Sequence, residues 1–71
     1  MGVEDELGRA VELHQSGDIL AAGTIYREIL AKEPDHVDAL NLLGVVMHTT
    51  GDLELAVELI SRAIELAPDY G

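Results

Sequence analysis

The stretch "HQSGD" at residues 14–18 returns as "HTTGD" at residues 48–52, a shift of 34 residues. In both stretches a glycine follows two polar residues, and an aspartate follows the glycine. Glycine adopts the left-handed backbone that commonly ends a helix. Aspartate often begins the next helix, because its carboxylate accepts hydrogen bonds from unpaired backbone amides. The sequence therefore predicts the same tight turn between two helices at both places.

The 34-residue period extends over most of the chain. Shifting the sequence by this period aligns eight identical pairs: Val3 with Val37, Val11 with Val45, His14 with His48, Gly17 with Gly51, Asp18 with Asp52, Ala22 with Ala56, Pro34 with Pro68 and Asp35 with Asp69. Self-similarity at a constant period of this length indicates a repeat architecture. We place repeat 1 at residues 3–36 and repeat 2 at residues 37–70, within a single domain that covers residues 1–71.

Each repeat contains two stretches whose apolar residues recur at helical spacing. Pro34 and Pro68 end the second stretch of each repeat, because the residue before a proline is pushed out of helical geometry. No alternating pattern competes for a strand. We expect an all-α fold of two tandem helix–turn–helix hairpins, which together give four antiparallel helices in an α-solenoid arrangement. The expected helices cover residues 3–16, 19–33, 36–50 and 53–67.

Local chemistry adds finer expectations about helix ends and packing. Asp18, Asp35 and Asp52 are expected to cap the helices that follow them, and His36 is expected to be a solvated turn residue beside Asp35. Residues without bulky side chains should lie where helices approach closely. These residues are Gly8, Ala10, Ala22, Gly23, Gly44 and Ala56.

The composition restricts the classes of partner. Fourteen acidic and four basic residues give a formal net charge of −10, which argues against nucleic acid, since phosphate binding needs Lys and Arg. It also argues against an anionic membrane surface. The first residues lack the basic and apolar regions of a secretory signal, and the longest apolar run, residues 42–47, is too short to span a bilayer. We expect a soluble, cytoplasmic protein that needs no cofactor and binds a basic or apolar protein partner.

The special residues of each repeat follow a known pattern. Repeat 2 has Leu40-x₂-Leu43-Gly44-x₂-Met47, then Ala56-x₃-Ile60, Ala63 and Pro68, and repeat 1 has Glu6-x₂-Arg9-Ala10-x₂-Leu13, then Ala22-x₃-Tyr26, Ile29 and Pro34. In period and spacing the chain resembles the tetratricopeptide repeat family. Glu6 and Arg9 depart from the pattern, because they replace large apolar residues. The first helix should therefore present a polar outer surface, as terminal repeats do.

The resemblance implies a protein-interaction scaffold in which the first helix of each repeat lines a concave groove. The ligand would be an extended peptide or a partner helix. An alternative is that the chain forms a non-catalytic arm of a larger enzyme, such as a bacterial transferase. Transferred to this sequence, the groove residues are Glu4, Leu7, Val11, His14, Gln15, Asp38, Asn41, Leu42, Val45, His48 and Thr49.

Catalytic and metal chemistry find little support in the sequence. No serine or cysteine occupies a nucleophile motif and no phosphate-binding glycine motif is present, so we do not expect an enzyme. His14 and His48 lie at equivalent places on neighbouring first helices, where one metal ion shared by both imidazoles is conceivable. Metal sites usually have three or four ligands, so exposed groove histidines are the simpler expectation.

The last helix is apolar over more of its circumference than one neighbouring helix can bury. Two explanations are open: the sequence is an excerpt of a longer array, or the exposed face is buried by self-association. Arrays usually need about three repeats for stability, which is compatible with both. We expect a homodimer through the last helix. The residues expected at this contact are Leu55, Leu59, Ile60, Ala63 and Leu66.

Overall fold

The computed structural model describes residues 2–68 and contains four α-helices and no strand within that range. The helices are α1 (Val3–Gln15), α2 (Ile19–Lys32), α3 (Val37–Thr50) and α4 (Leu53–Leu66). The all-α prediction is confirmed, and each predicted helix end lies within one residue of the observed end. The predicted end of repeat 2 at residue 70 lies outside the described residues.

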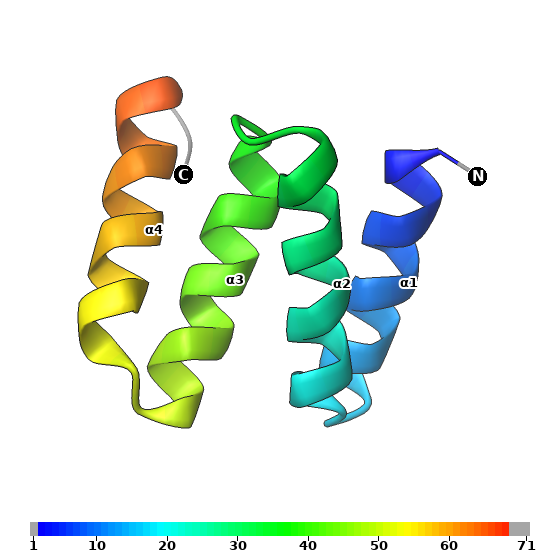
Figure 1. Cartoon of the computed structure of the whole chain (residues 1–71). Helices are drawn as coiled ribbons and strands as arrows, with labels where there is room; N and C mark the ends of the chain where they lie inside the picture. Colours follow the sequence, from blue (N-terminus) through cyan, green and yellow to red (C-terminus); the bar gives the residue numbers. More distant parts are fainter. Residues whose placement is uncertain (1, 69–71) are drawn as a thin grey trace.

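Each helix packs against the next one along the chain, so the close helix pairs are α1 with α2, α2 with α3, and α3 with α4. Consecutive helices run in opposite directions (Figure 1). The turn between α1 and α2 and the turn between α3 and α4 lie at one end of the molecule, and the connection from α2 to α3 lies at the other end (Figure 1). This arrangement is two helical hairpins in series, as the 34-residue period predicts.

The two glycine–aspartate turns have the same backbone geometry. Gly17 and Gly51 have φ angles of +97° and +95°, in the left-handed region that favours glycine. In each turn the backbone amide of the following aspartate, Asp18 or Asp52, donates to the carbonyl oxygen five residues earlier at 2.8 Å. This hydrogen bond satisfies a carbonyl group at the end of the preceding helix. The predicted role of the two glycines is confirmed.

The aspartates differ in their capping roles. The Asp52 carboxylate accepts a hydrogen bond from the Leu55 amide at 3.4 Å, as the sequence predicts. Asp18 precedes α2 but makes no side-chain hydrogen bond to the helix. The capping prediction is therefore confirmed for α4 and wrong for the side chain at α2.

The start of α3 also differs from the prediction, because His36 and not Asp35 is the cap residue. The His36 amide donates to the Glu33 carbonyl at 3.1 Å, which closes a turn through Pro34 and Asp35. This turn leaves His36 as the last residue before the helix. The His36 Nδ1 atom accepts a hydrogen bond from the amide of Ala39 at 3.1 Å, so His36 is a structural residue that satisfies a free helix amide.

The core is built from small and branched aliphatic side chains around one tyrosine. Tyr26 is fully buried and is the largest completely buried side chain of the described residues. Ile29 and Val46 are also fully buried, and burying an aliphatic side chain of this size contributes roughly 1.5–3 kcal/mol. The buried hydrophobic residues are Ala10, Ala22, Tyr26, Ile29, Ala39, Leu40, Leu43, Val46, Met47, Ala56 and Ala63.

Two of the three helix glycines are sites of close helix approach. A Cβ atom at Gly44 would lie 2.5 Å from Cγ1 of Ile60, so α3 and α4 need glycine at this position. A Cβ atom at Gly23 would lie 3.1 Å from Cγ1 of Val46, between α2 and α3. The prediction for Gly8 is wrong, because that residue is exposed and a Cβ atom there would meet nothing within 4 Å.

Candidate functional site

The predicted groove residues lie along α1 and α3 and differ in exposure. Leu7 and Leu42 pack against the core cluster, so they contribute only part of their side chains to any surface. Helices α1 and α3 are not among the closely packed helix pairs. The half-buried groove residues are Leu7, Val11, His14, Asp38, Asn41 and Leu42, and the exposed ones are Glu4, Gln15, Val45, His48 and Thr49.

The groove residues carry negative charge and lack a permanent cation. Their ionisable groups are the carboxylates of Glu4 and Asp38 and the two imidazoles. The four Lys and Arg residues of the chain all lie outside this set: Arg9, Arg27, Lys32 and Arg62. A surface of one sign attracts ligands of the opposite sign and speeds their association. The charges of the predicted groove residues therefore favour a basic ligand.

The two groove histidines have different environments. The Nδ1 atom of His14 and the hydroxyl of Tyr26 form a hydrogen bond at 3.3 Å, and the two rings meet edge to face with centroids 6.2 Å apart. Tyr26 is fully buried, and burial raises the pKa of its hydroxyl. His14 is half-buried, whereas the sequence predicts an exposed residue. His48 is exposed as predicted.

One difference in sequence between the repeats accompanies the different environments of His14 and His48. The residue 34 positions after Tyr26 is Ile60, which has no polar atom to offer His48. The pairing of His14 with Tyr26 therefore belongs to repeat 1 alone. It reduces the part of His14 that is free to meet a ligand and leaves His48 as the more accessible imidazole.

The histidine pair gains no further metal ligand from the rest of the fold. Among residues 2–68, no three His, Asp or Glu side chains lie together in a way that could hold a metal ion. One imidazole nitrogen of His14 is already hydrogen-bonded to Tyr26. Since protein metal sites usually have three or four ligands, the described residues give no support to a metal bound between His14 and His48.

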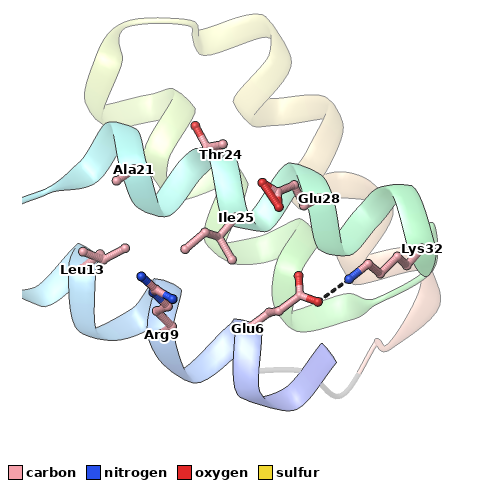
Figure 2. A pocket seen from close by; sticks show the side chains of 8 residues that line it. All are labelled: Glu6, Arg9, Leu13, Ala21, Thr24, Ile25, Glu28 and Lys32. Atoms are coloured by element: carbon pink, nitrogen blue, oxygen red, sulfur yellow. Dashed lines mark hydrogen bonds and ion pairs between the residues drawn. The ribbon is translucent and has the colours of Figure 1, made fainter. Parts of the chain in front are cut away.

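A surface hollow of about 650 Å³ lies on α1 and α2 (Figure 2). A hydrogen-bonded ion pair between Lys32 and Glu6 bridges the two helices beside it (Figure 2). Leu13 and Ile25 give the hollow an apolar part, and Arg9 points between the two helices (Figure 2). The lining residues are Glu6, Arg9, Leu13, Ala21, Thr24, Ile25, Glu28 and Lys32.

The repeat period explains what this hollow is. Three α1 residues that line it have equivalents in α3 that are buried in the core. The pairs are Glu6 with Leu40, Arg9 with Leu43 and Leu13 with Met47. In repeat 2 this surface lies under α2, since the Arg27 guanidinium lies 3.8 Å from the sulfur of Met47. In repeat 1, Glu6 and Arg9 make part of this surface polar, as the sequence predicts for a terminal helix, and Leu13 is half-buried.

The exposed apolar side chains of α4 are largely different from the predicted self-association residues. Ala63 is buried in the core, with 1% of its surface exposed. Leu55, Leu59 and Ile60 are half-buried, and Leu66 is exposed. The most exposed apolar residues of α4 are Leu53, Val57 and Ile64, at 56%, 64% and 53%.

We name Leu53, Val57 and Ile64 the open α4 row. The row lies on one side of the helix, because its members are separated by four and seven residues. The equivalent residues in α2, 34 positions earlier, are Ile19, Gly23 and Leu30. Gly23 is buried, and Ile19 and Leu30 pack against the core cluster.

No helix within residues 2–68 is both long enough and apolar enough to cross a membrane.

A family model described as tetratricopeptide repeat matches residues 7–71, which is most of the chain. The search of solved structures found no match.

Proposed function

The chain belongs to the tetratricopeptide repeat family, whose repeats generally form protein–protein interaction modules and are typically non-catalytic, and we propose that it binds a basic peptide or partner helix along α1 and α3. The observation that carries this proposal is the charge of that surface. The predicted groove residues include the carboxylates of Glu4 and Asp38 and no Lys or Arg. The homodimer through α4 that the sequence predicts is a separate hypothesis about a different surface.

The affinity and the selectivity of such binding would come from different residues. An exposed ion pair contributes at most about 1 kcal/mol, so Glu4 and Asp38 would mainly speed association and select the sign of the ligand. Most of the binding energy at an interface comes from a few side chains that become fully buried. Val45, which is 39% exposed, and half-buried Val11 are the apolar residues in position to do this.

The test uses labelled peptides of about 12 residues that alternate leucine with lysine, and matched peptides in which glutamate replaces lysine. Fluorescence anisotropy should show about tenfold tighter binding for the lysine peptides, equivalent to about 1.4 kcal/mol. The amide signals of Val11 and Val45 should shift in NMR spectra. Val45→Lys should weaken binding of the lysine peptides about tenfold, because it places a like charge among the apolar contacts.

The matched control is Leu20→Lys, which changes a leucine on α2 that is 73% exposed. This variant adds the same charge away from α1 and α3 and should bind as the unchanged chain does. Equal binding of lysine and glutamate peptides, or peptide-induced shifts that avoid α1 and α3, would show that this surface is not the ligand site.

A further inference from the structure

The open α4 row is the repeat equivalent of a surface that binds a helix elsewhere in the same molecule. In α2, the equivalent residue Gly23 lies against α3, and Ile19 and Leu30 pack against the core cluster. A Cβ atom at Gly23 would lie 3.1 Å from Val46 and 3.9 Å from Leu43, which places this position of α2 directly on α3. Helix α4 presents the same positions uncovered. The row therefore has the shape and spacing of a surface on which a helix packs.

One difference in sequence between the two surfaces limits how closely a helix can pack on α4. Position 23 is glycine in α2, and the equivalent position in α4 is Val57. A helix on α4 must leave room for the Val57 side chain, so it cannot lie as close as α3 lies to α2. An ordinary spacing of about 8–10 Å between helix axes accommodates a valine at the contact. The row is thus suited to a helix packed at normal distance.

The charges beside the row indicate the chemistry of that helix. Leu53 and Val57 line one hollow of about 420 Å³ together with Glu54 and Glu58, so two carboxylates border the apolar contact. The only cation of α4, Arg62, is paired with Asp35 at 3.0 Å. Among residues 2–68, Glu54 and Glu58 form no ion pair. An apolar contact bordered by these two carboxylates is complementary to an amphipathic helix that carries Lys or Arg beside its apolar face.

The same charges disfavour a second copy of this chain. Two α4 helices packed on each other would bring Glu54 and Glu58 of both copies to one interface, and each chain has a net charge of −10. Like charges placed opposite each other across an interface oppose binding. Stacking the row on the α1 surface of another copy is also disfavoured, because the apolar row would then cover Glu6 and Arg9.

We propose that the open α4 row is a second protein-binding surface, which accepts an amphipathic helix with basic residues beside its apolar face. It lies on α4, whereas the predicted groove residues lie on α1 and α3, and it acts independently of them. The binding mode is that of a helix whose apolar side chains at positions i, i+4 and i+7 contact an apolar surface.

The probe is a synthetic helical peptide of about 18 residues with leucine on one face and lysine beside it, labelled with fluorescein. A matched peptide carries glutamate in place of lysine. The lysine peptide should bind at least about tenfold more tightly than the glutamate peptide, and the difference should shrink in high salt. The amides of Leu53, Val57 and Ile64 should shift on binding.

Two substitutions of equal chemistry locate the surface. Val57→Lys should weaken binding of the lysine peptide at least about tenfold, because it places a positive charge in the apolar contact, where it repels the lysine residues of the peptide. Leu20→Lys changes a similarly exposed apolar residue on α2 and should leave binding unchanged. Circular dichroism of both variants establishes that the helices are retained.

Three results would overturn the inference. The first is equal binding of the two peptides, and the second is binding that Val57→Lys leaves intact. The third is a light-scattering mass of twice 7.6 kDa with concentration-dependent shifts in α4, which would identify a second copy as the occupant. Shifts confined to α1 and α3 would reject this surface but agree with the proposed groove, so failure here is distinguishable from failure there.

Discussion

The two repeats fill the same interior space with different pairs of side chains. In repeat 1 the pair is Ala10 and Tyr26, and both residues are fully buried. In repeat 2 the equivalent pair is Gly44 and Ile60, and a methyl group on Gly44 would lie 2.5 Å from Ile60. The branched isoleucine occupies space that an alanine methyl group would need, whereas in repeat 1 an alanine is accommodated in the same core cluster as Tyr26. The residue that can be accommodated at one position of a pair therefore depends on the residue at the other position.

The difference between the pairs also separates the two histidines. A buried tyrosine hydroxyl needs a hydrogen-bond partner, and His14 provides it at 3.3 Å. Ile60 makes no such demand, so His48 remains exposed on α3. The repeated histidine thus has a structural contact in repeat 1 and is accessible to a ligand in repeat 2. Identical residues at equivalent positions need not have the same role.

The two pairs should differ most in their contribution to stability when the large member of each is replaced by alanine. Tyr26→Ala should lower the free energy of unfolding by about 3–5 kcal/mol, as for other buried aromatic residues. Ile60→Ala should cost about 2 kcal/mol, since Ile60 is only half-buried. Urea unfolding followed by circular dichroism measures both. Equal losses would mean that the two pairs contribute equally and that the burial of Tyr26 has no special weight.

The small members test the matching of sizes directly. Gly44→Ala should destabilise by about 1–3 kcal/mol because it overpacks the contact with Ile60, although alanine favours a helix by about 1 kcal/mol over glycine. The double variant Gly44→Ala, Ile60→Tyr gives repeat 2 the pair of repeat 1 and should recover part of this loss. The reverse change, Ala10→Gly, should cost about 1 kcal/mol. Additive effects of the two changes in repeat 2 would contradict the matching.

The features that were predictable from the sequence depend on local chemistry. The ends of the helices follow from glycine, aspartate and proline, and the two turns have the geometry that Gly17 and Gly51 predict. The cap of α3 could not be predicted, because the turn through Pro34 and Asp35 displaces the helix start by one residue and gives the role to His36.

The surfaces were harder to predict because exposure depends on where neighbouring helices lie. The composition of α4 shows that it is apolar, but not which of its sides α3 covers. Ala63 was expected at a self-association contact and is buried, whereas Val57 was not and is exposed. For α1 and α3 the groove residues follow from family resemblance alone. Their exposure is described by the structure, and their function is a proposal.

The smallest expected effect concerns the hydroxyl of Tyr26, which has no counterpart in repeat 2. Tyr26→Phe removes the hydrogen bond to His14 and should cost about 0.5–1.5 kcal/mol near pH 7. Burial raises the pKa of Tyr26 above its ordinary value of 10.0, so the folded chain holds this proton where the unfolded chain has lost it. Stability from this group is complete below about pH 10 and is lost as pH rises through the raised pKa.

The same variant therefore has a distinct signature in alkaline solution. The stability difference between the unchanged chain and Tyr26→Phe should shrink between pH 7 and about pH 11, because only the unchanged chain loses the tyrosine contribution. The hydrogen bond to Glu6 raises the pKa of Lys32, which also lowers stability at high pH, and this effect is present in both chains. Comparing the two chains in a Glu6→Gln background removes it. A difference that stays constant with pH would show that Tyr26 ionises as readily in the folded chain as in the unfolded one.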